Sequence, residues 1–238
     1  MPRGRLHRLP PEFFSRPRKP TVTGPVGAGA APVAAPDVRV RIFVDFWNFQ
    51  LGINQAIGKK FQLDWKAFGP WITQRAAELT LEAGQQGRMR YEGLHVYLSY
   101  NPKKPEDTKL RHWATNVLDR FPGVQVTAME RKPKNPPDCP LCHVSVAVCP
   151  HCGGSMAGTV EKGVDTAIVT EMIRLAWEKS YDVAVLVSSD RDFIPAVDFL
   201  DKKGLKVIHA GFPPKGVDLA TSCWASFDLK KAKLPERP

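Results

Sequence analysis

The sequence has no apolar run that approaches the length of a membrane span. Its first twenty residues interleave arginine with proline and contain no hydrophobic core of the kind that signal peptides have. Secretion is therefore not expected, and we expect a cytoplasmic protein whose cysteines stay reduced. Cysteine is scarce as well: there are 5 in 238 residues, and four of them fall between residues 139 and 152.

Acidic residues are the scarcer charge, with 24 Asp and Glu against 34 Lys and Arg, which gives a net charge of +10. Most of this excess lies near the ends of the sequence. Residues 1–36 hold six basic residues and one acidic residue, and residues 229–238 hold four and one, so only +2 remains for residues 37–228. Basic segments of this kind favour a polyanionic partner, and we expect the protein to bind nucleic acid.

Composition also predicts how the chain is divided. Residues 1–36 combine basic residues with Pro and then repeat Gly, Ala and Pro, a composition that cannot build a core. We therefore expect a disordered arm there, a folded domain over residues 37–228 and a basic tail over residues 229–238. An apolar share of 43% is enough for one good core.

Predicted strands and helices alternate along the folded domain. Short apolar runs rich in Val and Ile predict strands that are buried on both faces, and apolar residues at helical spacing predict helices. The expected strands are 41–45, 94–100, 124–129, 183–188 and 205–209, and the expected helices are 64–80, 106–121, 166–180 and 193–203. This alternation predicts an α/β fold with a mostly parallel central sheet.

Four carboxylates lie at the ends of these elements. Asp45 ends the run 41–44, Asp190 and Asp192 follow the run 183–187, and Asp165 opens a predicted helix. The carboxyl ends of parallel strands are where open α/β sheets place their active sites. Clustered carboxylates raise one another's pKa unless a cation lies between them. Mg²⁺ or Mn²⁺ fits such a cluster, because hard cations take oxygen ligands.

The residues around these acids resemble the motifs of one family. The segment Asp45-Phe46-Trp47-Asn48 is similar to the D-x-x-N that opens NYN domains. The segments Lys162-Gly163-Val164-Asp165 and Ser188-Ser189-Asp190-Arg191-Asp192-Phe193 resemble the K-G-V-D helix start and the S-x-D-x-D-F motif of the same family, and all three occur in the family's order. The resemblance covers roughly residues 37 to 228.

This resemblance implies a PIN-like, three-layer fold with the strand order 3-2-1-4-5. It also implies a metal-dependent endoribonuclease, in which Asp45, Asp165, Asp190 and Asp192 are ligands of Mg²⁺ or Mn²⁺ and Asn48 is a further polar site residue. RNA is the substrate that the family implies, whereas composition alone does not distinguish RNA from DNA. A nucleic-acid-binding or adaptor module with little or no catalysis remains an alternative, since a fold does not define a function.

Several of these residues also have structural interpretations. Asp45 could cap a helix, and Asp165 could complement a helix dipole from the first turn. Asp192 could be a metal ligand or only the N-cap of the helix that begins at Phe193. Trp47 could stack on a base or belong to the core. Trp47 also stands two residues after Asp45, where a phosphatase of the haloacid dehalogenase type needs a second Asp, so we rank that class last.

An insertion over residues 135–158 carries its own chemistry. Cys139, Cys142, Cys149 and Cys152 form two C-x-x-C pairs, a spacing that suits one tetrahedral Zn²⁺. Two disulfides are the alternative that a cytosolic protein makes less favourable. The zinc could staple a loop that is too small to hold itself together, or the insertion could also touch substrate. The remaining Cys223 has no partner in the sequence and is expected to be a small buried hydrophobe.

The site implied by these patterns would hydrolyse phosphodiester bonds with metal assistance. Ser188 and Ser189 have no neighbouring His base in the sequence and are not expected to be nucleophiles. Basic side chains around the acids would hold the phosphate backbone without reading sequence. The candidates for this role are Lys109, Arg111, Arg131, Lys132, Lys134 and Lys162.

Overall fold

The computed structural model describes residues 37–82 and 87–237, all within one unit that spans Ala35–Pro238. The predicted basic arm, residues 1–36, lies outside the described residues. None of the helices in the described ranges has both the length and the apolar character that crossing a bilayer requires.

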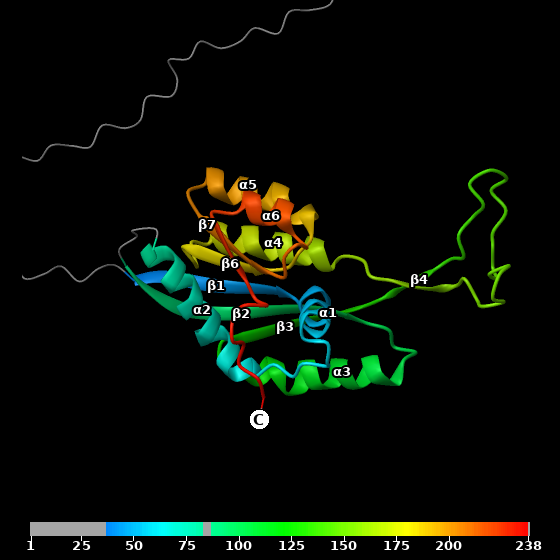
Figure 1. The fold of residues 1–238 in the computed structure, drawn as a ribbon, viewed down its shortest axis with the longest axis horizontal. Coiled ribbons are helices and arrows are strands. Elements are labelled where there is room, and N and C mark those ends of the chain that lie inside the picture. The colour runs from blue at the N-terminus through cyan, green and yellow to red at the C-terminus, as the bar shows by residue number, and fades with distance from the viewer. Residues whose placement is uncertain (1–36, 83–86, 238) are drawn as a thin grey trace, which may run out of the picture. The chain divides into compact units, whose positions relative to one another are not determined.

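A six-stranded, entirely parallel sheet forms the centre of the fold (Figure 1), with the strand order β3-β2-β1-β6-β7-β8. The predicted order of the first five strands is therefore confirmed, and β8 adds an edge strand that the sequence analysis did not predict. The strands are β1 (Asp37–Asp45), β2 (Arg88–Tyr100), β3 (Val124–Glu130), β6 (Val183–Val187), β7 (Lys206–Gly211) and β8 (Ala225–Asp228).

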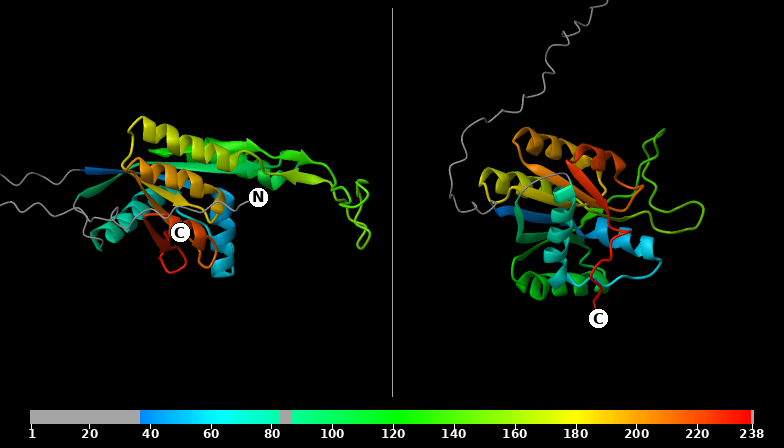
Figure 2. Two further views of the ribbon diagram at one scale, coloured as in Figure 1. Left: turned by 90° about the horizontal axis from the view of Figure 1, so that it is seen from above. Right: turned by 60° about the vertical axis from the view of Figure 1, so that its left-hand side comes forward.

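Helices cover both faces of the sheet, which gives three layers (Figures 1 and 2). One face packs against α1 (Phe46–Ile57), α2 (Trp65–Glu82) and α3 (Pro105–Asn116), and the other against α4 (Val164–Trp177), α5 (Ile194–Lys202) and α6 (Val217–Ser222). Two short 3₁₀ turns, η2 (Leu118–Arg120) and η3 (Arg191–Phe193), follow α3 and β6.

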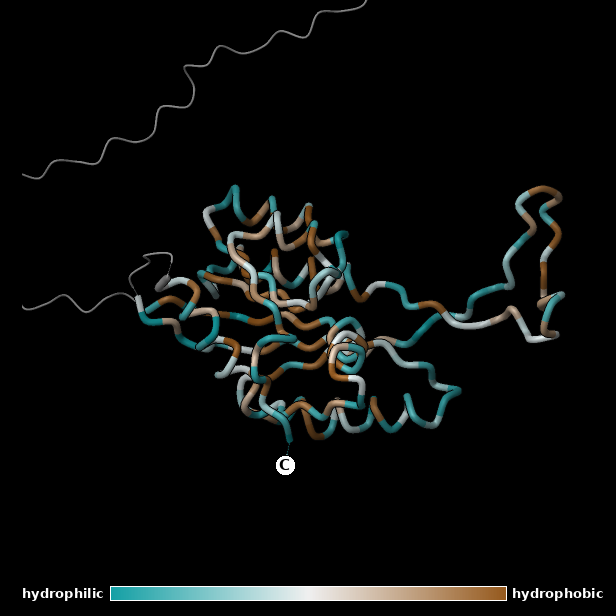
Figure 3. The backbone as a smooth tube through the Cα atoms, in the orientation of Figure 1, coloured by the Kyte–Doolittle hydropathy of each residue, from teal (hydrophilic) through white to brown (hydrophobic). Residues whose placement is uncertain are grey.

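Strand β1 shows why the apolar runs are continuous. Val40, Ile42 and Val44 are fully buried in the core beneath α1, α2 and α3, whereas Phe43 is fully buried in the core beneath α4 and α5. Successive side chains point to opposite faces of a strand, so a sheet covered on both faces requires apolar residues at every position. In Figure 3 the hydrophobic stretches accordingly follow the central strands.

Helix α1 begins directly after β1 and was not predicted. Its sequence is rich in aromatic residues and contains Gly52, and both features lower helix propensity. In the structure Gly52 is buried, and a β-carbon added there would lie 2.4 Å from the ring of Phe212. The close approach of that ring therefore requires glycine, and tertiary packing overrides the low helix propensity.

The chain beyond β8 packs back onto the domain. Leu229 is fully buried and Leu234 nearly so. The last described residues pair with the segment before α2: the amide of Asp64 donates to the carbonyl of Pro235 at 3.0 Å, and that of Arg237 donates to the carbonyl of Gln62 at 2.8 Å. The predicted basic tail thus contributes buried residues to the fold.

The insertion is a long excursion between β3 and α4. It leaves the sheet through β4 (Lys132–Lys134) and returns through β5 (Gly158–Val160), which pair in antiparallel fashion. Figures 1 and 2 show the segment between β4 and β5 projecting away from the carboxyl edge of the sheet. Its cysteine-bearing turns therefore stand clear of the helices.

Candidate functional site

The acids lie at the carboxyl edge of the sheet, where β1 and β6 end and α4 begins. Asp45 is the last residue of β1, Asp190 follows β6 after two serines, and Asp165 is the second residue of α4. Strands β1 and β6 are neighbours in the sheet, with Val44 paired to Val187, so the residues that follow them come close together. The topology therefore gathers side chains that are far apart in the sequence.

A hydrogen-bond network joins the end of β1 to the loop after β6. Asp45 Oδ1 accepts from the amide of Asn48 at 3.1 Å, and Asp45 Oδ2 accepts from Ser188 Oγ at 3.4 Å. Asn48 Oδ1 accepts from the amide of Ser189 at 2.9 Å, and the amide of Asp190 donates to Ser188 Oγ at 3.2 Å. The serines are thus supports of the acidic loop.

His209, on β7, is bonded to the same loop, and the sequence did not predict it as a site residue. It is buried, and its Nε2 lies 2.8 Å from the carbonyl oxygen of Ser188, an acceptor, so Nε2 carries the proton. Burial lowers the pKa of His209, which favours the neutral ring. In the described part of the chain its Nδ1 is buried without a hydrogen-bond partner. The sequence signal for His209 was its position at the end of the predicted strand 205–209.

The two interpretations of Asp192 are separated by the local geometry. The amide of Asp192 donates to Asp190 Oδ1 at 2.9 Å, so Asp190 is the residue that caps the η3 turn. Asp192 itself is exposed within that turn, and α5 begins without a side-chain cap. The alternative in which Asp192 caps the following helix is therefore not what the structure contains.

Asp45 and Asp165 each fill a structural role as well. Asp45 is the N-cap of α1, and Asp165 lies in the first turn of α4, where a negative charge complements the helix dipole. Helix α4 starts after Gly163, whose φ of 90° lies in the left-handed region that favours glycine. This turn directs the chain from the insertion into the acidic cluster.

Glu161 is a fifth acid of the cluster, and the sequence analysis missed it. It accepts a hydrogen bond from Ser99 Oγ, and its carboxylate lies 3.7 Å from the guanidinium of Arg131. Arg131 also donates to Ser99 Oγ at 2.9 Å and lies over the ring of Trp47 at 5.7 Å. The sequence signal for Glu161 was its place just before the segment 162–165; it directly follows β5, a three-residue strand that the sequence did not predict.

Burial and mutual repulsion set the protonation of the cluster. Burial raises the pKa of Asp45 to about 6. The charges of Glu161, Asp165 and Asp190 act in the same direction, and the hydrogen bond from the amide of Asn48 acts against them. Burial together with the charges of Asp190, Glu161 and Asp192 raises the pKa of Asp165. These directions are those expected of acids that face one another without a compensating cation.

The donor chemistry of the cluster suits a hard divalent cation. The carboxylates at the end of β1, after β6 and at the start of α4 raise one another's pKa through their charges, and a cation among them would lower those pKa values. Within residues 37–82 and 87–237, no three His, Cys, Asp or Glu side chains are arranged to hold one metal ion. Asp45, Asp165 and Asp190 fit such a cation by the chemistry of their oxygen atoms, but their side chains are not gathered around one point.

The predicted nucleic-acid contacts fall into two groups. Arg131 is half-buried and held by Glu161, Ser99 and Trp47, so it belongs to the site itself. The others are exposed: on α3, on β4 and just before α4. They are Lys109, Arg111, Lys132, Lys134 and Lys162.

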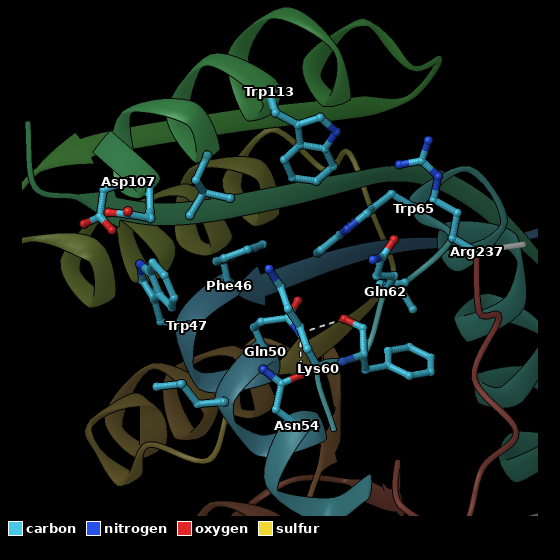
Figure 4. Close-up of a pocket in the computed structure, with 15 residues that line it drawn as sticks. Phe46, Trp47, Gln50, Asn54, Lys60, Gln62, Trp65, Asp107, Trp113 and Arg237 are labelled. Carbon is cyan, nitrogen blue, oxygen red and sulfur yellow. Dashed lines mark hydrogen bonds between the residues drawn. The ribbon is translucent and has the colours of Figure 1, made fainter. Parts of the chain in front are cut away.

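Two hollows flank the N-terminal half of α1. One, of about 480 Å³, adjoins the acidic loop and is lined by Asn48, Asp190, Arg191 and Lys215 among others. The other, of about 410 Å³, lies between α1, the segment before α2, and α3 (Figure 4). Leu51, 60% exposed on α1, lines both. The acids therefore lie beside two concave surfaces.

The two cysteine pairs form turns of the same geometry. In the first, the amide of His143 donates to the carbonyl of Cys139 at 2.8 Å, and in the second the amide of Gly153 donates to the carbonyl of Cys149 at 2.9 Å. His143 and Gly153 are both left-handed, with φ of 57° and 69°. Backbone amides that face Cys139 and Cys149 lower the pKa of each thiol.

Each turn favours the thiolate form in which cysteine binds Zn²⁺, although no three of the four sulfurs are gathered around one point in the described residues. All four cysteines are free, so the disulfide alternative is not what the structure contains. His143 and His151, which neighbour the cysteines, are exposed, as are Cys142 and Cys152. Cys223 is half-buried, and burial raises the pKa of its thiol to about 12.

Comparison with known proteins identifies the family. No curated protein matches the chain. Among solved structures, a protein of unknown function from Vibrio parahaemolyticus is similar, with 16% sequence identity and a TM-score of 0.44 over 81% of this chain and 94% of that one. The NYN domain matches residues 39–223, a range that includes the whole sheet except the first residues of β1 and the last strand, β8. Because this match spans more than half of the sequence, the chain belongs to the NYN domain family.

Proposed function

We propose that the protein is a metal-dependent endoribonuclease, in which Asp45, Asp165 and Asp190 hold Mg²⁺ or Mn²⁺. Membership of the NYN family, a group of PIN-like nucleases, supports nucleic acid as the substrate class. The observation that carries the proposal is the buried Asp45, whose pKa is raised to about 6 while three other carboxylates add to its negative surroundings. Such a concentration of charge is costly for a protein that only binds phosphates.

The other polar residues of the site would position these acids. Asn48 fixes the loop after β6 by accepting the amide proton of Ser189, and Ser188 links Asp45 to the amide of Asp190. Asp192 and Glu161 would add charge at the edge of the cluster. Because Arg131 neutralises part of Glu161, it would limit the repulsion of an approaching phosphate.

A divalent cation bound here would supply charge stabilisation at the scissile phosphate and would lower the pKa of an attacking water. No protein nucleophile is needed, and the hydroxyl of Ser188 is occupied by Asp45 and by the amide of Asp190. The exposed Lys109, Arg111, Lys132, Lys134 and Lys162 would hold the phosphate backbone on either side. We also propose that Cys139, Cys142, Cys149 and Cys152 hold one Zn²⁺ that staples the insertion.

The test is Asp190→Asn. Asparagine can still accept the amide proton of Asp192 and cap the η3 turn, so the fold should remain while the charge that holds the cation is lost. We expect cleavage of labelled single-stranded RNA in Mn²⁺ or Mg²⁺ to fall at least about 100-fold. Affinity for RNA in EDTA should stay equal or increase, because one repelling charge is removed.

Asp201→Asn is the matched control, since Asp201 is an exposed acid on α5 away from the cluster. It should cleave RNA as the wild type does. Cleavage by wild-type protein in excess EDTA, or full activity of Asp190→Asn, would refute the proposal. Binding of RNA without any cleavage by the wild type would instead identify an RNA-binding module.

A further inference from the structure

The cavity of about 410 Å³ beside α1 has the size and lining of a ligand site (Figure 4). Phe46 and Trp47, which line it, directly follow Asp45 in the sequence, so its wall begins one residue from the acidic cluster. Trp47 is also joined to that cluster, because Arg131 lies over its ring and is paired with Glu161. A polynucleotide held at the acids would therefore lie near one wall of this cavity.

Aromatic rings surround the cavity and are held in place. The indole of Trp47 donates to the carbonyl of Ser99 at 2.6 Å, which fixes the orientation of its ring. Trp65 is buried, stacks on Phe46 at 6.0 Å between ring centroids and lies 6.3 Å from Trp113. Trp113, on α3, is only half-buried and borders the open cavity. Such rings offer flat surfaces on which a base can stack.

Two amides on α1 provide hydrogen-bonding groups of opposite kind. Gln50 Nε2 donates both to Asn54 Oδ1 at 2.9 Å and to the carbonyl of Phe61 at 3.0 Å, and Asn54 Oδ1 also accepts from the amide of Phe61. Among the described residues, these bonds use neither Gln50 Oε1, which can accept a hydrogen bond, nor Asn54 Nδ2, which can donate one. One acceptor and one donor thus remain on a rigid support, as an edge of a nucleobase requires.

Charges of both signs line the cavity: Glu106 and Asp107 are acidic, with Asp107 Oδ2 accepting from the amide of Asn101 at 2.8 Å, and Lys60 and Arg237 are basic. Lys60 and Arg237 line the cavity and are exposed, so their cations are available to the phosphates that flank a base. Arg237 is positioned by its amide, which donates to the carbonyl of Gln62. The other hollow, on the far side of Asn48, also carries cations, Arg191 and Lys215. A strand lying across the acids would meet basic side chains on both sides.

We infer that this cavity is a nucleobase-binding subsite, which takes one unpaired base of the RNA next to the phosphate held at the acids. The inference rests on the proposed function for the identity of the substrate. It adds that the site selects single-stranded RNA, because a base held in a duplex cannot enter the cavity. Discrimination among bases would come from Gln50 and Asn54.

Binding without cleavage provides the test, because it does not depend on catalysis. We would measure the affinity of the full chain, in EDTA, for a labelled single-stranded RNA and for an oligonucleotide of the same length in which stable abasic spacers replace the nucleotides. The two probes carry the same phosphate charge, so the ratio of their affinities reports the bases. We expect wild-type protein to prefer the RNA by about 5- to 150-fold, the range for stacking of one base.

Trp113→Ala should lower the affinity for RNA at least about 5-fold and leave the affinity for the abasic probe within a factor of about two. Trp177→Ala is the matched control, because Trp177 is 79% exposed on α4 and lies outside this cavity. If loss of Trp113 unfolds the protein by circular dichroism, Leu110→Trp is the second variant. It fills the cavity from the same helix without removing an aromatic ring and should have the same effect.

Equal affinity of wild-type protein for the two probes would overturn the subsite, as would wild-type behaviour of both Trp113→Ala and Leu110→Trp. The outcome for the nuclease is separate. A base preference that disappears in these variants, in a protein that never cleaves RNA in Mn²⁺, would support the subsite and refute the nuclease. If the wild type cleaves RNA and both variants keep full cleavage and unchanged RNA affinity, the nuclease would be supported and the subsite refuted.

Discussion

Asp45 combines two tasks that oppose each other energetically. As the N-cap of α1 it satisfies a backbone amide, which stabilises the helix, but it is only 7% exposed and is surrounded by other carboxylates. The raised pKa of about 6, against an ordinary 3.8, measures the resulting penalty on its charged form. Folding therefore brings together charges that only a ligand of opposite sign can compensate.

The sign of the pH dependence follows from that shift. Between pH 4 and pH 6 the folded protein holds a proton at Asp45 more tightly than the unfolded chain does, so the free energy of unfolding falls as pH rises through this window. At pH 7.5 in EDTA the full penalty, about 3 kcal/mol, is present. Asp45→Asn keeps the cap and removes the charge. It should therefore raise the free energy of unfolding by about 1 to 3 kcal/mol at pH 7.5 and change it little at pH 3.5.

Chemical denaturation of both proteins in EDTA at the two pH values checks this prediction. Asp182→Asn is a control of opposite sign, because the hydrogen bond from Arg39 lowers the pKa of Asp182 and its charge stabilises the fold at neutral pH. That variant should be less stable than the wild type at pH 7.5. Added Mn²⁺ should stabilise the wild type and not Asp45→Asn. A stability difference for Asp45→Asn that is equal at both pH values would contradict the assigned burial of its charge.

At the scale of elements, the insertion depends least on the rest of the fold. Strands β4 and β5 pair over three positions, and each cysteine turn closes through one further pair, Asp138 with Ser145 and Val148 with Ser155. Its apolar side chains are largely outside the core, and Leu141 is 89% exposed. So small a segment lacks the buried area to stabilise itself. A bound metal would supply that stability.

We therefore expect about one Zn²⁺ per chain in protein purified under reducing conditions. Replacing Cys139 and Cys142 with Ser should release the metal and make residues 135–158 sensitive to limited proteolysis, while the thermal unfolding of the sheet domain changes little. Cys223→Ser is the control, since Cys223 lies outside the insertion and should not affect zinc content. The absence of zinc from reduced wild-type protein would refute the site.

The elements that the sequence predicted well are those whose burial is continuous. Strand β6 has five buried residues in a row, a short Val-rich run typical of strands covered on both faces, and the carboxyl edge of such strands locates Asp45 and Asp190. Helix α1 was missed because Gly52 lowers its helix propensity, and the reason for that glycine, the ring of Phe212, lies far away in the sequence. Strand β8 was missed because it has four residues, and their burial is only partial.

Within the candidate site, too, the residues beside continuous apolar segments were predicted and those placed by tertiary packing were not. Asp45, Asp165 and Asp190 stand next to patterned segments, and a motif of the family surrounds each one. Glu161 belongs to a polar approach to α4, and only the return of the insertion places it beside Ser99 and Arg131. The aromatic cavity is formed by α1, the segment before α2, α3 and the last described residues of the chain. Because these elements meet only through tertiary packing, no local pattern predicts it.

At the scale of the whole molecule, charge is separated along the chain. Residues 37–228 carry only +2 of the net +10, and within them the functional site is acidic, whereas residues 1–36 carry +5. Residues 229–238, which pack onto the domain, carry the remaining +3, so about half of the long-range attraction of RNA would come from residues 1–36 and half from the folded residues. Affinity and catalysis should consequently respond to different parts of the sequence.

Deletion of residues 1–36 tests this separation. It removes no candidate metal ligand, so the cleavage rate at saturating RNA should be unchanged while the affinity for RNA falls. Each cation that neutralises a phosphate of a single strand contributes about 0.7 to the slope of log affinity against log salt, so the loss of six can reduce that slope by up to roughly 4. The six are Arg3, Arg5, Arg8, Arg16, Arg18 and Lys19.

The matched control keeps the full length and replaces these six residues with Gln. If charge is what the segment contributes, this variant should lose the same amount of slope as the deletion, because both remove the same cations. The salt slope is obtained from RNA affinities measured in EDTA between 50 and 300 mM salt for the wild type, the deletion and the Gln variant. An unchanged slope in both variants would show that the segment does not meet RNA. A fall in the saturated rate with the deletion alone would show that residues 1–36 act in the folded domain through contacts other than charge.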